Sequence, residues 1–312
     1  MPDSNPAHAF SLEYLLKIPV PAEPADFAEF WQARYQHSVS LDPAPQLQPS
    51  LLTHPDFDCF DLSYYSTDQF QIGGWLIAPK HQPINRGVVV GHGYGGREGP
   101  DFHLPISNAV MVFPCFRGIA RSRHPTIPEP PNLHVLSNIQ NRDDYIIGGC
   151  VADLWLAVSA LSQLFPQTIG HIGYLGISFG GGLGALACAW DARIERAHFN
   201  VPSFGNQPLR LQLPTLGSAA ALQNAQQGNF NLLDTLSYYD AATAAKHIQI
   251  PVHIAAALAD PVVTPPGQFS IYNALNCSKQ LLVLNQGHGE YPEQAQQEHS
   301  LLTELEAFFR TL

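Results

Sequence analysis

Short apolar runs and amphipathic segments alternate along most of this 312-residue chain. Runs that are apolar at nearly every position suit strands buried on both faces of a parallel sheet. We expect such strands at residues 87–91, 109–114, 169–176, 196–201, 250–257 and 279–284. Apolar residues that recur at three- and four-residue steps predict helices at residues 145–164, 180–190, 233–246, 267–275 and 294–312. Strands alternating with helices predict a doubly wound, mostly parallel α/β sheet.

The N-terminal part of the chain has a different pattern. Residues 27–35 are typical of a short amphipathic helix, and the Pro-rich residues 41–50 predict an extended connector. Residues 57–77 alternate between apolar and polar positions, with an interruption at Gly73-Gly74, which indicates an N-terminal antiparallel extension at a sheet edge. We therefore predict a single α/β domain over residues 1–312, in which residues 1–55 wrap the main body.

Two segments do not fit the alternation of strands and helices. Residues 120–141 are rich in Pro and His, and residues 203–229 are rich in Gln, Leu and Ala. Insertions above such a sheet commonly form the lid of a pocket. We expect both segments to contact the substrate, and residues 203–229 to form an inserted cap.

The composition excludes several classes of partner. The chain carries 15 basic and 26 acidic residues, a net charge of −11, with no Lys/Arg run, so we expect no nucleic-acid and no membrane partner. The first residues lack a basic stretch followed by an apolar one, and we expect no apolar run long enough to span a bilayer. Since 45% of the residues are hydrophobic, the chain can fill a thick core. These features predict a cytoplasmic protein.

The cysteines and histidines show no metal-site spacing. The five cysteines are spread widely without a C-x-x-C pair, so we interpret them as small hydrophobic residues. They are Cys59, Cys115, Cys150, Cys188 and Cys277. The fourteen histidines include no pair spaced for one face of a helix, and we predict no metal.

The most informative motif is Gly-Ile-Ser-Phe-Gly at residues 176–180, where a predicted buried strand ends and a helix rich in small residues begins. A sharp strand-to-helix turn crowds the backbone around its middle residue. Glycines two positions before and after that residue relieve the crowding and leave a serine hydroxyl exposed. The N-terminus of the following helix also offers N–H groups and a positive dipole end to an oxyanion. This placement indicates Ser178 as a nucleophile.

Two other interpretations of this motif are a glycine-rich turn with an incidental serine and a phosphate-binding loop. Residues 180–184 lack the Lys of a P-loop, and no Asp or Glu follows a first βα turn at the distance that a dinucleotide site requires. The position between strand and helix therefore favours the nucleophile.

A serine hydroxyl needs a general base, and that base needs a third group to orient it. In the α/β-hydrolase fold the chain order is Ser, acid, His. Asp260 follows the apolar run 254–259, and His288 follows the predicted strand 281–284. Both stand at strand ends, where open α/β sheets bind their ligands. We predict that Asp260 is the orienting acid and His288 the general base.

Alternatives exist for both residues. Asp260 could form a turn before Pro261, and His288 could be a solvent-facing loop histidine. Glu290 and Asp240 compete as acids, although Glu290 is close to His288 in the sequence and Asp240 lies in a helix-like stretch. The position at the end of a predicted strand favours Asp260, and the glycines on both sides of His288 favour a functional loop.

The oxyanion hole of this fold uses the N–H after the nucleophile and an N–H from the loop after an early strand. These groups are the backbone N–H groups of Phe179 and of Tyr94, which lies in His-Gly-Tyr-Gly-Gly at residues 92–96. The alternative for residues 92–96 is a flexible turn, which their position after a predicted strand disfavours.

With these motifs the chain resembles, nearly from end to end, the acetyl xylan esterase / cephalosporin C deacetylase family of carbohydrate esterases. The matching motifs are Phe-Ala-Glu-Phe-Trp at 27–31, Gly-Trp-Leu-Ile-Ala-Pro-Lys at 74–80, residues 92–96, Phe-Arg-Gly at 116–118, Asp-Tyr at 144–145, Gly-Ile-Ser-Phe-Gly-Gly at 176–181, Ala-Asp-Pro-Val-Val-Thr-Pro-Pro at 259–266 and Gly-His at 287–288. The resemblance implies an α/β-hydrolase fold.

The resemblance also implies site residues and an activity. It assigns the triad to Ser178, Asp260 and His288 and an oxyanion N–H to Tyr94. It implies removal of acetyl groups from small sugar and antibiotic esters, without a cofactor, by intracellular homo-oligomers.

This sequence departs from the family pattern at two positions. Phe179 and Ile119 stand where the family usually has Gln, and we expect these replacements to change the lining of the site. Arg117 could pair with an acid such as Asp153 and brace the site, or it could be a surface or structural arginine.

Three functions are compatible with these residues. The first is a serine esterase that transfers short acyl groups to water. The second keeps the triad but cleaves peptides, as the related oligopeptidase-like hydrolases do. The third is a non-catalytic binding protein that kept the fold, because fold alone does not imply function. The presence of all three triad residues disfavours the non-catalytic protein. We see no additional propeller domain and no acidic cluster that would hold a peptide N-terminus, which disfavours the peptidase.

Overall fold

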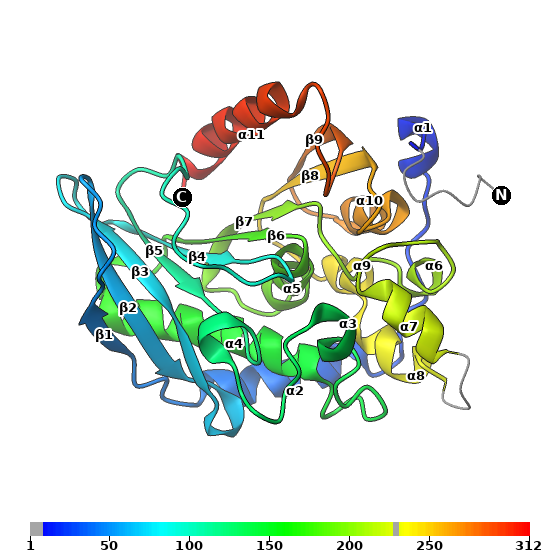
Figure 1. Ribbon diagram of the computed structural model, residues 1–312, viewed down its shortest axis with the longest axis horizontal. Coiled ribbons are helices and arrows are strands. Elements are labelled where there is room, and N and C mark those ends of the chain that lie inside the picture. The colour runs from blue at the N-terminus through cyan, green and yellow to red at the C-terminus, as the bar shows by residue number, and fades with distance from the viewer. Residues whose placement is uncertain (1–8, 227–230) are drawn as a thin grey trace.

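The computed structural model describes residues 9–226 and 231–312, whose strands form one sheet of nine strands (Figure 1). The strand order is β1-β2-β3-β5-β4-β6-β7-β8-β9. The strands are β1 (Gln46–Pro49), β2 (Phe57–Tyr65), β3 (Gln71–Pro79), β4 (Arg86–Gly91), β5 (Ala109–Pro114), β6 (Ile172–Ile177), β7 (Ile194–Asn200), β8 (Val252–Ala259) and β9 (Lys279–Gln286). The strands β1, β2 and β3 pair antiparallel, and β3 also pairs antiparallel with β5. The six strands β4 to β9 form the parallel part. This topology confirms the predicted sheet with its N-terminal antiparallel extension.

Helices cover both faces of the sheet, as a doubly wound fold requires (Figure 1). The longer ones are α2 (Phe27–Val39), α4 (Ile146–Leu164), α5 (Phe179–Cys188), α10 (Pro265–Ala274) and α11 (Gln294–Phe309). Successive strand residues face opposite sides. In β4, Val89 packs in the layer that contains α2, α4 and α5, whereas Val88 and Val90 pack in the layer that contains α11. The parallel strands are therefore buried on both sides.

Helix α4 packs between α2 and the sheet. By length and composition alone α4 is long and apolar enough to cross a membrane, so the expectation that no apolar run reaches that span is wrong. In this structure most of the helix is buried inside the protein. The hydrophobicity of α4 is thus explained by its place in the core, since a helix that is apolar all round suits a core as well as a bilayer.

The N-terminal segment runs along the outside of the main body. The Phe10 N–H donates to the Leu258 carbonyl at 2.8 Å, the Trp31 Nε1–H donates to the Tyr238 carbonyl at 2.7 Å, and α1 (Leu12–Leu15) packs on α10. The predicted connector at 41–50 contains the strand β1, which pairs with β2. The edge strand is therefore β1, and Gly73-Gly74 lies inside β3 without interrupting it.

The predicted helix at 233–246 is broken in the structure. It consists of α8 (Leu233–Leu236), a 3-10 turn η4 (Ser237–Tyr239) and α9 (Ala241–Ala245). Asp240 is extended, and its carboxylate accepts the N–H groups of Ala242 and Thr243 at 2.9 and 3.0 Å. A side chain that caps the start of a helix favours a new helix start over continuation, so the prediction of one helix is wrong here.

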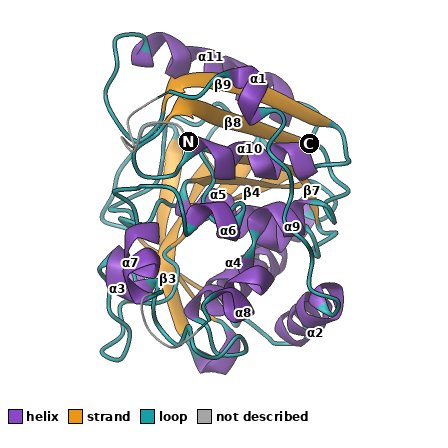
Figure 2. Ribbon diagram, turned by 90° about the vertical axis from the view of Figure 1, so that its right-hand side faces the viewer, coloured by secondary structure: helices purple, strands orange, loops and turns teal. Residues whose placement is uncertain are grey.

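Short elements gather at one end of the molecule (Figure 2). They are α3 (Pro131–His134), α6 (Gln207–Arg210), α7 (Ala219–Ala225) and α8, with further 3-10 turns η1 (Thr67–Gln69), η2 (Ala120–Ser122) and η3 (Pro166–Thr168) elsewhere. Contacts join α3 to α7 and α6 to α8. The two segments that broke the strand–helix alternation, 120–141 and 203–229, supply α3, α6 and α7. Residues 227–229 of the second segment lie outside the described residues, as do residues 1–8 of the predicted wrapping segment 1–55.

Candidate active site

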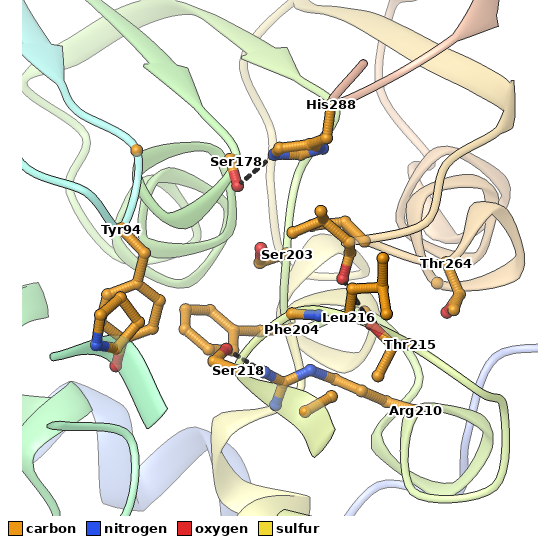
Figure 3. A pocket seen from close by; sticks show the side chains of 18 of the residues that line it. Tyr94, Ser178, Ser203, Phe204, Arg210, Thr215, Leu216, Ser218, Thr264 and His288 are labelled. Carbon is orange, nitrogen blue, oxygen red and sulfur yellow. Dashed lines mark hydrogen bonds between the residues drawn. The ribbon is translucent and has the colours of Figure 1, made fainter. Parts of the chain in front are cut away.

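The three predicted triad residues stand at the carboxyl ends of parallel strands of the same sheet. Ser178 follows β6, Asp260 follows β8 and His288 lies in the loop after β9. His288 Nε2 lies 2.9 Å from Ser178 Oγ, and His288 Nδ1 lies 2.8 Å from Asp260 Oδ2 (Figure 3). Residues separated by 110 and 28 positions in the sequence are thus joined in one hydrogen-bonded chain.

Ser178 sits on a sharp turn between β6 and α5. Its backbone has φ 54° and ψ −109°, a combination that L-residues rarely adopt and that costs free energy unless the surroundings enforce it. A Cβ at Gly176 would lie 2.5 Å from the carbonyl oxygen of Gly180, and a Cβ at Gly180 would lie 2.7 Å from the carbonyl carbon of Gly91. Only glycine fits at both positions, which is the physical reason for the spacing seen in the sequence.

Asp260 is fully buried and its carboxylate is fully engaged. Oδ1 accepts the N–H groups of Val262 and Val263 at 2.8 and 2.9 Å, and Oδ2 accepts from His288 and from Gln268 Nε2 at 3.0 Å. Backbone N–H groups stabilise the ionised form of such a carboxylate. Asp260 is therefore held rigidly with one oxygen aimed at His288.

The partners of His288 fix which ring nitrogen carries the proton. An ionised carboxylate only accepts hydrogen bonds, so Nδ1–H donates to Asp260 and the unprotonated Nε2 accepts from the Ser178 hydroxyl. His288 itself has φ 45°, and the Cβ of any residue replacing Gly287 would lie 2.3 Å from Asp260 Oδ2. Gly287 is thus required for the approach of His288 to the carboxylate.

The backbones of Tyr94 and Phe179 lie where an oxyanion hole is expected. Phe179 begins α5, and in the described part of the chain neither its N–H nor that of Tyr94 donates to a protein acceptor. The two rings stack with centroids 4.0 Å apart, which holds the two residues together. A developing oxyanion needs two such N–H donors, so the predicted oxyanion hole at Tyr94 and Phe179 is compatible with these contacts.

His92 fastens the loop that carries Tyr94. Its Nε2 accepts the Phe116 N–H at 3.1 Å and its Nδ1 donates to the Gly93 carbonyl, while its own carbonyl accepts the Gly180 N–H at 2.9 Å. Burial, with a smaller contribution from the charge of Arg97, lowers the pKa of His92 to about 3. The ring is therefore neutral at physiological pH and joins the loop to α5.

Behind Tyr94 lies a second polar chain. The Tyr94 hydroxyl lies 2.9 Å from His134 Nδ1, and His134 Nε2 lies 2.9 Å from the Arg117 carbonyl. The Arg117 guanidinium binds the fully buried Asp153 at 2.6 Å. The predicted Arg117–Asp153 pair is thus present, and it is connected to the site through His134 and Tyr94; its bracing role stays a prediction.

The triad opens into a cavity of about 490 Å³. Residues of both predicted lid segments line it: Pro131 and Asn132 from the first, and Ser203, Phe204, Gly205, Arg210, Thr215, Leu216, Gly217, Ser218 and Ala219 from the second. Figure 3 shows Ser178 and His288 at one side of this cavity and Arg210 with Ser218 at the other. The two segments therefore form walls around the triad.

Two sequence expectations about the lining are wrong. Phe179 and Ile119, which replace the family's Gln, are 0% and 1% exposed and do not line the cavity. The Phe179 ring packs among the rings of Tyr94, Phe116 and Phe204. These replacements change the layer behind the site and not its surface.

The competing acids are placed elsewhere. Asp240 caps α9, and its carboxylate also accepts the N–H groups of Asn206 and Gln207 at 3.3 and 2.6 Å. Glu290 is exposed. In residues 9–226 and 231–312 neither acid hydrogen-bonds to His288, and no three His, Cys, Asp or Glu side chains gather in a way that could hold a metal.

The strand order and the turn that presents Ser178 define the class of this protein as the α/β-hydrolase fold. The chain belongs to the acetyl xylan esterase (AXE1) family, whose model matches residues 8–304. This confirms the resemblance inferred from the motifs.

Individual relatives are distant in sequence. The acetyl esterase Axe7A of Xylanibacter ruminicola is 23% identical over 301 residues; the match covers 86% of this chain but only 64% of that protein. Acetyl xylan esterase 1 from Thermoanaerobacterium sp. JW/SL YS485 superimposes with a TM-score of 0.81 at 19% identity, over 96% of this chain and 99% of that one. The acetyl xylan esterase from Paenibacillus sp. R4 gives 0.80 at 23% identity, over 96% and 100%. The structural similarity establishes the fold.

Sequence reasoning missed several residues around the triad. Gln268 donates to Asp260 and to the Val263 carbonyl, and its Oε1 accepts the Ala257 N–H at 2.9 Å. Only its position eight residues after the acid hinted at a role. His134 and Arg210 lay in the irregular segments, where no hydrophobic period indicates which side chains point inward.

Proposed function

We propose that this chain is a serine carboxylic-ester hydrolase that removes acetyl groups from small esters such as acetylated sugars. The observation that carries the proposal is the hydrogen-bonded chain from Ser178 Oγ through His288 to Asp260, opening into a cavity. Membership of the acetyl xylan esterase family supports acetyl as the acyl group and acetylated sugars as the substrates.

The geometry supports a two-step acyl transfer. As Ser178 Oγ attacks the acyl carbon, His288 Nε2 takes the hydroxyl proton, and the Asp260 carboxylate stabilises the resulting imidazolium. His288 then returns the proton to the leaving alcohol, and the acyl group stays on Ser178. Water, deprotonated by His288, attacks the acyl-enzyme, releases acetate and regenerates the serine.

The N–H groups of Tyr94 and Phe179 would bind the oxyanion of each tetrahedral intermediate. Removing one such donor typically lowers kcat about 10²- to 10³-fold. Because both donors are backbone groups, the replacement of Gln by Phe179 leaves this contribution in place. The neutral His92 and the stacked rings keep the loop of Tyr94 next to α5.

The test is hydrolysis of a graded series of nitrophenyl acyl esters and of acetylated xylose by the wild type and by Ser178→Ala. We expect activity on acetate and acetylated sugars, lost in a variant that folds normally by circular dichroism. Unchanged turnover by Ser178→Ala would contradict the mechanism. Activity only on longer or aromatic esters would keep the mechanism and overturn the substrate.

Two further outcomes separate the alternative functions. Faster cleavage of peptides than of esters in a substrate panel would indicate a peptidase. Failure of a fluorophosphonate to label Ser178 would indicate a non-catalytic protein. Labelling together with ester hydrolysis supports the esterase.

We also propose a homo-oligomeric protein of the cytoplasm. The family resemblance and the net charge of −11 support this. Light scattering of the purified protein and fractionation of cells that express it test the two statements.

A further inference from the structure

The cavity beside the triad contains one permanently charged side chain. Among its described lining residues, Arg210 is the single Arg or Lys, and none is Asp or Glu. Arg210 lies across the cavity from Ser178 and His288 (Figure 3). Such an isolated charge in a largely uncharged pocket usually orients a ligand.

Neutral groups hold the Arg210 guanidinium in place. Nη1 donates to Gln207 Oε1 at 3.2 Å, Nη2 donates to Ser218 Oγ at 3.1 Å, and the guanidinium lies 5.0 Å from the Phe204 ring centre. The other N–H groups, including that at Nε, have no protein acceptor in the described part of the chain. Arg210 is thus fixed in position with donors left over.

Arg117, the other buried arginine in the described part of the chain, has a carboxylate partner, since it lies 2.6 Å from Asp153. Even the half-buried Arg193, whose side chain is 31% exposed, lies 2.7 Å from Asp191. Arg210 is only 9% exposed, yet no carboxylate in residues 9–226 and 231–312 lies within 4.0 Å of it. Burying an unpaired charge is unfavourable, and burial correspondingly lowers the pKa of Arg210.

The nearby buried acid, Asp240, is not the carboxylate partner of Arg210. Asp240 reaches Arg210 only through Gln207, whose backbone N–H it accepts at 2.6 Å, and three more backbone N–H groups occupy the same carboxylate. Among the described residues, therefore, no carboxylate faces the guanidinium from the cavity.

We propose that Arg210 binds a carboxylate of the substrate, so that the preferred substrates are acetyl esters of small hydroxy acids such as sugar acids. The inference rests on the proposed esterase function of the same site. A carboxylate matches the single positive charge and the planar guanidinium. A phosphate dianion would bring a second negative charge into a cavity that has no second cation. The hydroxyls of Ser203 and Thr264 face the same cavity and make no hydrogen bond within the described residues, so they are available for sugar hydroxyls.

The overall charge makes this local cation decisive. With a net charge of −11 the protein does not attract anions at long range. Selection of an anionic ester must therefore come from the cavity itself.

The experiment compares matched esters that differ only in charge. 4-Acetoxybenzoate and 4-acetoxybenzamide have nearly the same shape, as do acetylated glucuronic acid and its amide. We expect the wild type to prefer the anionic member of each pair in kcat/KM by about tenfold or more, the effect of a hydrogen bond to a charged group. Arg210→Met should abolish this preference and Arg210→Lys should restore part of it.

The ratio of the two kcat/KM values separates recognition from a structural role. A structural defect lowers both members of a pair and leaves their ratio unchanged. Arg123→Met removes the same charge from an exposed position, with a side chain 69% exposed, and should keep the wild-type ratio. If Arg210→Met does not fold, competitive inhibition of the wild type by benzoate and by benzamide decides: stronger inhibition by benzoate supports the proposal, and equal inhibition overturns it.

The outcomes distinguish this inference from the proposed function. If the wild type hydrolyses neutral acetates and the ratio does not change in Arg210→Met, the carboxylate site is wrong and the esterase stands. If it hydrolyses no ester, nitrophenyl acetate included, both are wrong. Faster turnover of 4-acetoxybenzenesulfonate than of 4-acetoxybenzoate would overturn the assignment to a carboxylate.

Discussion

The substitution Gly287→Ala tests the triad without changing any of its members. The added Cβ would lie 2.3 Å from Asp260 Oδ2 and 3.1 Å from the Cγ1 atom of Val201, so it is wedged between the carboxylate and the sheet. Ordinary contact requires at least 3.4 Å, so the His288 loop and the carboxylate must separate by about 1 Å. A displacement of that size typically costs about 10²-fold in rate, and loss of the orienting hydrogen bond about 10⁴-fold.

We therefore expect kcat/KM on nitrophenyl acetate to fall between about 10²- and 10⁴-fold in Gly287→Ala. The matched control is Gly289→Ala, whose Cβ would come closer than 3.4 Å only to the end of the flexible Gln286 side chain, at 2.5 Å. That variant should keep activity within about threefold, well below the loss expected from a 1 Å displacement. Thermal melts of both variants establish that they fold. A folded Gly287→Ala enzyme with more than half of the wild-type activity would refute the assignment of Asp260 and His288 as a working pair.

Three further predictions concern the residues around the site. Gln268→Met removes a side-chain donor to Asp260, so kcat should fall about tenfold while KM stays unchanged. Steady-state kinetics on nitrophenyl acetate measures both constants. An unchanged kcat would contradict a positioning role for Gln268. Asp153→Asn leaves the Arg117 charge buried without its partner and should lower the free energy of unfolding in urea by about 3 kcal/mol. Asp68→Asn, at an exposed acid 3.7 Å from the same guanidinium, should change it by less than about 0.5 kcal/mol, and equal effects would rule out the buried pair as the main contribution. The pKa of His92 is lowered to about 3 in the folded protein, so between pH 3 and about 6.5 the unfolded chain binds more protons, and the free energy of unfolding falls as the pH drops through this range. In His92→Gln the slope of the unfolding free energy against pH should be smaller by up to about 1.4 kcal/mol per pH unit. An unchanged slope would contradict a buried neutral ring.

The sheet and the triad residues could be predicted because each depends on local rules. A buried parallel strand must be apolar at nearly every position, and a serine on a sharp turn must have glycines two positions on either side. The structure shows both reasons: β4 is buried on its two faces, and Gly176 and Gly180 have no room for a Cβ. The order of Ser178 and the later acid and histidine then follows from the fold.

Where the predictions failed, tertiary contacts decided the local structure. The sequence around Asp240 reads as one helix, but the carboxylate binds backbone N–H groups of two segments and starts a new helix there. Gln268 looks like any polar residue on α10, and its role is visible only when α10 packs beside β8. Periodicity reports which face of an element is buried and not which distant group a buried polar side chain meets.

Contacts in the fold, and not the sequence pattern, also indicate which residues determine the substrate preference. Phe179 and Ile119 attracted attention because they replace polar residues of the family, yet both are buried in the layer behind the oxyanion loop. Many of the residues that line the cavity come from 203–219, an irregular segment with no hydrophobic period to constrain it. Since the catalytic residues stand on rigid strand ends and this segment forms one wall of the cavity, its side chains can change the preferred ester without disturbing the triad. Arg210 is the residue of this wall whose charge gives the strongest reason to expect such a preference.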